Sequence, residues 1–148
     1  MKADGETDIE DIALFAGCTH AELEFIMSTS TRTLVPAGLE VSRQGQTDRQ
    51  CVVILSGEVC VEHDCQQVAI AGVGEVIGEI GLIEGGVAHR TARTITECEL
   101  LVFTSNEFAS MMSAVPRVAL KIQRDAIHHL LEIDSLHSHS GPDSTPVP

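Results

Sequence analysis

The stretch of sequence around which the fold is organised is GEVIGEIGLIEGGVAHRTA, which runs from Gly74 to Ala92. Five glycines divide it into very short apolar pieces, and glycine lets a backbone turn sharply or come close to a ligand. Glu79 lies among the apolar residues, and Arg90 follows the last glycine pair. Backbone N–H groups, one carboxylate and one guanidinium form a cradle that suits a sugar phosphate. A glycine-rich turn with solvated charges is the alternative interpretation.

The composition limits the possible partners. At 148 residues with 43% hydrophobic content, the chain has the size of one globular domain with its own core. Nine basic residues against 22 acidic ones give a net charge of −13. We therefore expect no direct binding to nucleic acid, which requires basic side chains. Binding to an anionic membrane is improbable for the same reason.

The sequence also predicts a cytoplasmic protein. No apolar run approaches the roughly 18 residues of a membrane span, so we expect no membrane insertion, and the first residues do not begin a signal peptide. The five cysteines include no CxxC pair and are typical of small buried apolar residues in a reducing compartment. A disulfide between Cys60 and Cys65 is the minor alternative.

The periodicity of apolar residues predicts a mainly β domain. Residues 1–7 are polar and are expected to form a flexible N-terminus. Asp8 to Ala16 has helical spacing, and Thr19 with Glu22 has the form of a capping box that opens a second short helix. From residue 31 the period changes to two, and short strands separated by glycine turns continue to residue 104. This pattern indicates a closed β-sandwich or jelly roll.

Two further helices are predicted after the strands. The first opens at Ser105, and Pro116 suits the first position of the second. The apolar stripe of the second helix is broader than a helix on one sheet requires, so part of it is expected to pack against a second copy of the chain. We expect the domain to span residues 8–134, with residues 135–148 as a disordered tail.

Four short motifs occur in a characteristic order: LFAG at 14–17, SGEV at 56–59, GEIG at 78–81 and CELL at 98–101. Together with the order of the elements, they resemble the cyclic nucleotide-binding domain of the catabolite-activator and kinase-regulatory-subunit type, over residues 9–133. The resemblance implies an eight-stranded jelly-roll β barrel with N-terminal helices and two C-terminal helices. It implies a sensor or regulatory domain for a cyclic nucleoside monophosphate, cAMP or cGMP and most simply cAMP. Neither an enzyme activity nor a cofactor is expected.

The resemblance also implies which residues bind the ligand. Glu79 would bind the ribose 2′-hydroxyl, and Arg90 would pair with the cyclic phosphate. Backbone amides of the short helix that follows Gly78 would face the same phosphate at a helix N-terminus. The full set that the resemblance implies for the cassette is Gly78, Glu79, Ile80, Gly81, Leu82, Arg90, Thr91 and Ala92.

In this family the last helix covers the base of the nucleotide. Its position after Pro116 would place Leu130, Ile133 and Asp134 over the base, although these residues also suit dimer or core contacts. The helix-turn-helix that reads DNA in the activators, and any kinase or channel module, are expected to be absent. The partner that receives the signal is an unidentified effector protein or domain.

The position of the arginine leaves two alternatives open. Counted without gaps from the glycine pair at 85–86 to Cys98, the arginine of the family falls on Ala88. Either the loop is two residues longer and the next strand two residues shorter, which puts Arg90 in register, or the site has lost its arginine. Side chains alternate along a strand, so residues 88 and 90 point to the same face and Arg90 can still reach inward.

Two other functions compete with a cyclic nucleotide sensor. One is a degenerate fold that has lost its ligand and acts in dimerisation or protein docking through the helix from Pro116. The other is a jelly-roll metal enzyme, which needs several histidines and a carboxylate converging inside the roll. We expect no metal site, because the histidines are poorly spaced and are expected to be solvated. These histidines are His63, His89, His128, His129, His137 and His139.

Overall fold

The structure, a computed structural model, describes residues 8–140 except residues 48 and 85. At Glu84 and at residues 132–140 it describes the backbone alone. The expected flexible segment at residues 1–7 and the expected tail from residue 141 onward therefore lie outside the described residues. Among the described residues no helix is both long enough and apolar enough to cross a bilayer.

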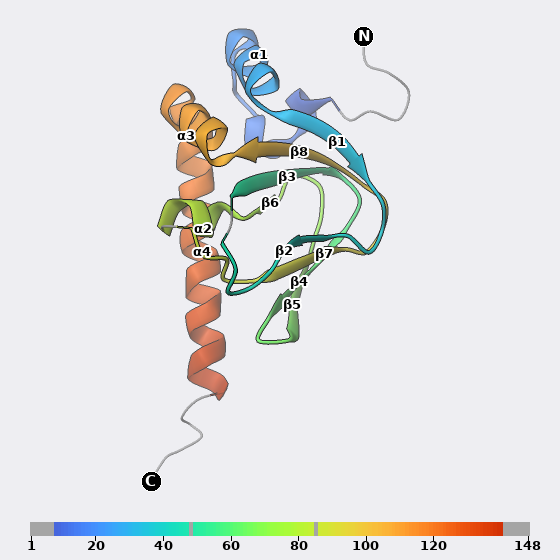
Figure 1. Cartoon of the computed structure of the whole chain (residues 1–148). Helices are drawn as coiled ribbons and strands as arrows, with labels where there is room; N and C mark the ends of the chain where they lie inside the picture. Colours follow the sequence, from blue (N-terminus) through green and yellow to red (C-terminus); the bar gives the residue numbers. More distant parts are fainter. Residues whose placement is uncertain (1–7, 48, 85, 141–148) are drawn as a thin grey trace.

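The described residues form eight strands in two four-stranded antiparallel sheets, in the orders β1-β8-β3-β6 and β2-β7-β4-β5. The predicted mainly β fold with flanking helices is confirmed, and the sheets wrap around a common interior (Figure 1). The bounds are β1 Thr31–Val35, β2 Glu40–Ser42, β3 Gln50–Ser56, β4 Val59–His63, β5 Gln66–Ala71, β6 Val76–Ile77, β7 Thr91–Thr94 and β8 Cys98–Thr104.

Helices flank the sheets near both ends of the described chain (Figure 1). Asp8 to Ala16 does not form one helical segment, because Ile12 adopts an extended backbone between two short 3-10 turns. The predicted capping box of Thr19 and Glu22 is present at the start of α1. The bounds are η1 Ile9–Asp11, η2 Ala13–Phe15, α1 His20–Thr29, α2 Glu79–Glu84, α3 Ser105–Ala114 and α4 Pro116–Ser140.

Strand β3 is apolar on both of its faces because it separates two clusters of buried side chains. Val53 and Leu55 point towards the helices and pack with residues such as Phe103 and Ile122. Ile54 points to the opposite face and packs between the two sheets. This alternation follows from the period of two along a strand. The second cluster forms the floor of the cavity described below.

Helix α4 continues beyond the boundary that the sequence predicted. It runs to Ser140, whereas a disordered tail was expected from Ser135. Serine and histidine are compatible with a helix, and the strong helix breakers Gly141 and Pro142 come only after this point. In Figure 1, α4 passes along one side of both sheets, beside α2.

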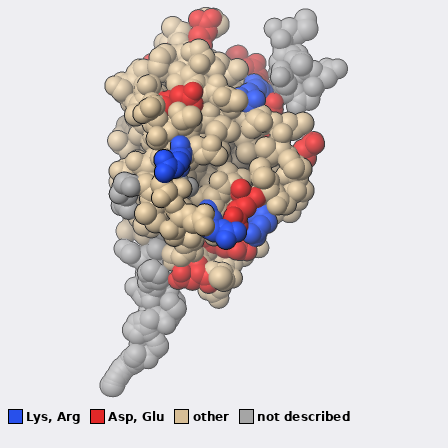
Figure 2. Space-filling model, in the orientation of Figure 1, with Lys and Arg blue, Asp and Glu red and all other residues tan. Residues whose placement is uncertain are grey.

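Basic side chains are few on the face of the molecule shown in Figure 2, as expected from the acidic composition. Most of the Lys and Arg side chains on this face lie beside Asp and Glu side chains. Three of the described charged residues form such a group, in which Arg43 and Arg93 both pair with Glu40, at 2.8 and 3.0 Å. On this face the basic side chains do not gather into the continuous patch that nucleic acids select.

Candidate functional site

A cavity of about 220 Å³ lies between the β2-β7-β4-β5 sheet, α2 and α4. Its floor is apolar and includes Val61, Ala71 and Ala92. Its walls carry the charged groups, which come from four separate parts of the chain: the turn between β5 and β6, the start of α2, the residue before β7, and the middle of α4. An apolar floor with a few converging polar groups is the usual form of a small-molecule site.

The structure brings together most of the residues that the resemblance implied for the cassette. The residues that line the cavity are Gly78, Glu79, Ile80, Gly81, Arg90 and Ala92. Two members of the set are elsewhere. Leu82 packs against the larger core cluster, and the hydroxyl of Thr91 accepts a hydrogen bond from the backbone N–H of Gln44 at 3.0 Å. Both therefore support the walls of the cavity and do not line it.

Glu79 is the most deeply buried charged side chain of the cavity, with 2% of its surface exposed. It occupies the first position of α2, where a carboxylate is stabilised by the helix dipole. Gly78 directly before it has a φ of 94°, which only glycine adopts without strain, and this sharp turn aims the start of α2 at the cavity. The glycine spacing in the sequence thus places a carboxylate inside the fold.

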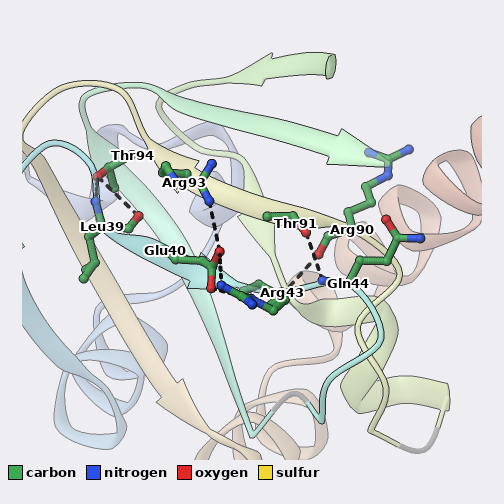
Figure 3. Close-up of polar contacts among 9 residues, drawn as sticks. Leu39, Glu40, Arg43, Gln44, Arg90, Thr91, Arg93 and Thr94 are labelled. Atoms are coloured by element: carbon green, nitrogen blue, oxygen red, sulfur yellow. Dashed lines mark hydrogen bonds and ion pairs between the residues drawn. The ribbon is translucent and has the colours of Figure 1, made fainter. Parts of the chain in front are cut away.

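Arg90, and not Ala88, supplies the guanidinium of the cavity. Ala88 is 4% exposed and its backbone is bonded to Gln46 and Gly45, both at 2.9 Å. Strand β7 begins only at residue 91, so Arg90 lies directly before it. The Arg90 side chain extends away from the group formed by Glu40, Arg43 and Arg93 (Figure 3). Its Nη2 donates a hydrogen bond to the backbone oxygen of His129 at 3.3 Å.

Helix α4 contributes three polar residues that the sequence analysis did not assign to the ligand site: Asp125, His128 and His129. The expectation that these histidines are solvated was wrong for His129, whose side chain is 17% exposed and bonded to Glu79. Both histidines reach the same cavity. Their spacing of three and four residues from Asp125 places all three on one side of the helix, and this spacing is the signal that could have revealed them.

The residues expected to cover the base are not found among the described lining of the cavity. Leu130 is half-buried but does not line the cavity. The side chains of Ile133 and Asp134 lie outside the described residues. Among the residues whose side chains are described, those of α4 that line the cavity are Asp125, His128 and His129, and this result depends on the rotation of α4. Alignment from Pro116 alone could not determine this rotation, since it depends on how α4 packs against α2.

Another histidine differs from the sequence expectation. His63 is 7% exposed, and its Nδ1 lies 2.8 Å from the backbone oxygen of His89. His89 itself is half-buried and lines the cavity. The solvated state expected for His63 was wrong, because the end of β4 packs against the segment that leads into β7.

His129 has an altered proton affinity. Its Nδ1 lies 3.1 Å from Oε2 of Glu79. This hydrogen bond raises the pKa of His129 above its ordinary value, and the charges of Glu79 and Asp125 act in the same direction. Burial and the positive charge of Arg90 oppose the rise without cancelling it. The imidazolium is therefore stabilised inside the cavity.

The same residues have donor types that suit a divalent cation. Ligand atoms of Glu79, Asp125 and His129 lie within 4.8 Å of one another. However, Nδ1 of His129 is bonded to Glu79, and Arg90 places a positive charge nearby. We therefore assign this cluster to a hydrogen-bonded ion pair.

The chain is similar to proteins that contain a cyclic nucleotide-binding domain. The family model of the cyclic nucleotide-binding domain matches residues 32–115. A cyclic nucleotide-gated potassium channel of Rhizobium etli is 30% identical over 116 residues, which is 78% of this chain and 32% of the channel. The chain thus spans about a third of that relative.

Two solved structures share the fold. The catabolite activator protein of Thermus thermophilus has a TM-score of 0.72 at 26% identity, covering 86% of this chain and 62% of that chain. The regulatory subunit of a cAMP-independent protein kinase A from Trypanosoma brucei has a TM-score of 0.71 at 16% identity, covering 80% and 43%. The second likeness shows the fold alone. Both halves of the sequence resemblance, to activators and to kinase regulatory subunits, are confirmed at the level of the fold.

Proposed function

This chain belongs to the cyclic nucleotide-binding domain family, and from that premise we propose that its cavity binds a cyclic nucleoside monophosphate, cAMP or cGMP, as the signal of a regulatory domain. One observation carries the proposal: Glu79 and Arg90, which are 11 positions apart in the sequence, line the same cavity. The family assigns these residue types to the ribose and to the phosphate.

The chemistry of the two groups matches the two ends of the proposed ligand. A guanidinium forms paired hydrogen bonds with phosphate oxygens and remains charged at any physiological pH. A buried carboxylate accepts hydrogen bonds from hydroxyl groups. The backbone N–H groups at the start of α2 would complete the phosphate site, and Ala92 on the floor leaves room for the ligand. The net charge of −13 disfavours anions in general, so recognition must come from these local groups.

The base would be covered by α4. We propose that Asp125 and His128 face it, because they line the same cavity from the helix side. This assignment replaces Leu130, which points elsewhere, and retains the idea that the last helix responds to the ligand. Contacts that α4 makes only when the ligand is bound would shift the population of its positions. An effector protein or domain would then detect the change.

A second copy of this chain is the partner that we propose for α4. The exposed apolar residues Leu120, Ile127 and Leu131 have 49%, 58% and 62% of their surfaces accessible. Their spacing of seven and four residues is typical of paired helices. Light scattering of the purified protein tests this proposal: Leu131→Asp should convert a dimer into a monomer, and a wild-type monomer at high concentration would contradict it.

Isothermal titration calorimetry tests the ligand. We expect heat of binding with cAMP or cGMP and none with 5′-AMP, whose phosphate is not cyclic. The chain contains no Trp and no Tyr, so intrinsic fluorescence cannot replace this measurement. Arg90→Ala should weaken binding by roughly 100-fold or more, because an anion site loses its charged partner.

Arg93→Ala is the matched control. Arg93 belongs to the adjoining strand but pairs with Glu40 outside the cavity, so its loss should leave the affinity within about twofold. A folded wild-type protein that gives no heat at millimolar cAMP and cGMP would reject the proposed function. The fold would then act without a ligand, in dimerisation or docking.

A further inference from the structure

Helix α4 contacts both Glu79 and Arg90. The ring of His129 bonds to Glu79 at 3.1 Å, and the backbone oxygen of the same residue accepts a hydrogen bond from Arg90 at 3.3 Å. A single residue of α4 therefore contacts the group proposed for the ribose and the group proposed for the phosphate. These contacts link three segments that lie 39 and 50 positions apart in the sequence.

The cavity is small for a ligand site because His129 and Glu79 fill part of it. Its volume of about 220 Å³ is below the roughly 300 Å³ at which small-molecule sites begin. The His129 side chain is 17% exposed and that of Glu79 is 3% exposed, so the ion pair is shielded from water. Oε2 of Glu79 is the atom that bonds to His129, so a ligand that uses this oxygen must take the place of the ring.

We propose that His129 is a proton-dependent latch: its imidazolium holds Glu79 while no nucleotide is bound, and a cyclic nucleotide binds by displacing the ring from Glu79, with α4 still beside the cavity. The proposal rests on the proposed function, because it concerns access to the same cavity. It adds a regulatory input, since the latch is strong only while His129 carries a proton. Ligand binding and proton release are then coupled, and each must affect the other equally.

The charges around His129 determine the direction of this coupling. The pKa of His129 is raised in the closed domain and returns towards its ordinary value of about 6.5 when the ring leaves Glu79. The closed domain therefore holds its proton to higher pH than the open one, and raising the pH favours opening. The titratable or charged groups that line the cavity around His129 are Glu75 from the β5–β6 turn, Glu79 from α2, His89 and Arg90 from the segment before β7, and Asp125 and His128 from α4.

The first experiment needs no nucleotide. Histidine NMR of the full chain measures the pKa of His129 directly, with the resonance assigned by His129→Gln. We expect a value above the ordinary one in the wild type, and a fall towards it in Glu79→Gln, because the amide removes the negative charge. A His129 pKa that does not respond to Glu79→Gln would overturn the latch, whether or not any ligand binds.

The second experiment measures cAMP affinity between pH 6 and pH 9 by calorimetry. The wild type should bind roughly twofold to threefold more tightly at the upper end, because the closed domain loses its bound proton over this range. Binding in this range should release protons, which titrations in buffers of different ionisation enthalpy detect. His129→Gln should abolish the dependence, whereas His20→Gln, which changes an exposed histidine of α1 outside the cavity, should retain it.

The outcomes separate the latch from the proposed function. Binding that is tight but independent of pH, or tighter at low pH, would overturn the latch and leave the proposed function intact. Absence of binding at every pH would reject the proposed function and the coupling to a ligand. The NMR titration would then still decide whether His129 and Glu79 form the proton-dependent contact.

Discussion

Two arginine–glutamate pairs in this molecule have different surroundings. Arg32 on β1 and Glu99 on β8 bond directly to each other through two hydrogen bonds, at 2.8 and 3.3 Å. Arg90 and Glu79 line one cavity, yet each of them bonds to His129 of α4. In the first pair the charges satisfy each other across neighbouring strands. In the second pair each side chain bonds to a third element instead of to the other.

The difference shows how the same residue types serve the fold in one place and a site in another. The register of β1 and β8 places Glu99 opposite Leu34, two residues along β1 from Arg32, so the pair forms as soon as the sheet does. The partners of Arg90 and Glu79 depend on the position of α4. A helix that moves can release two opposite charges into a cavity, and a polar ligand with an anion and a hydroxyl can replace it.

The largest effect expected from this comparison is on stability. Arg32→Ala should lower the free energy of unfolding by about 2 kcal/mol, because Glu99, which is 8% exposed, loses its partner. Urea denaturation followed by far-UV circular dichroism measures this loss.

The control for Arg32→Ala is the double variant Arg32→Met with Glu99→Leu. It should recover most of the stability, since apolar residues of similar size can replace a buried pair. Cyclic nucleotide affinity should be unchanged in both proteins. A change in affinity would show that the first pair also belongs to the site.

The next effect concerns the carboxylate of the cavity. Glu79→Ala should weaken cAMP binding roughly 20-fold, about 1.8 kcal/mol, because the ribose hydroxyl loses a charged acceptor. Titration of both proteins with 2′-deoxy-cAMP, which lacks the ribose hydroxyl, completes a thermodynamic cycle of two proteins and two ligands. The wild type should lose affinity for this analogue, and Glu79→Ala should bind both ligands equally.

Glu75→Ala is the matched control for Glu79→Ala. Glu75 also lines the cavity but is exposed and bonds to the backbone of Gly72. If Glu75→Ala weakened binding as much as Glu79→Ala, the ribose assignment would be wrong.

A smaller effect separates charge from geometry at Arg90. Arg90→Lys keeps the positive charge but removes the planar fork that bonds two oxygens at once. We expect cAMP affinity to fall roughly fivefold, about 1 kcal/mol, with a free energy of unfolding close to that of the wild type. An affinity equal to that of the wild type would mean that Arg90 acts only as a point charge.

The smallest effect is the pH dependence of stability. The folded-state pKa of His129 is raised, so its contribution is complete below the ordinary value of about 6.5 and is lost as pH rises through the folded-state value. Between pH 6 and pH 9 the wild type should lose about 0.5 kcal/mol relative to His129→Gln, a modest figure because burial and the charge of Arg90 oppose the protonated form. Thermal unfolding of both proteins measures the difference, and parallel curves would contradict it.

The sequence predicted the local elements well where neighbouring residues decide them. The capping box of Thr19 with Glu22 and the short strands between residues 31 and 104 are examples. It was less reliable where a segment is short. Asp8 to Ala16 has helical spacing but forms two separate turns, because an isolated helix of this length is marginal without tertiary support.

The sequence by itself determined the family, the order of strands and turns, and the glycine that turns Glu79 into the fold, because these depend on local backbone preferences and on the period of apolar residues. Only the tertiary structure decided that Arg90 rather than Ala88 reaches the cavity and that α4 presents Asp125, His128 and His129 to it. Those outcomes depend on where β7 begins and on the rotation of α4 against α2. A long-range packing arrangement of this kind has no periodic signal along the chain.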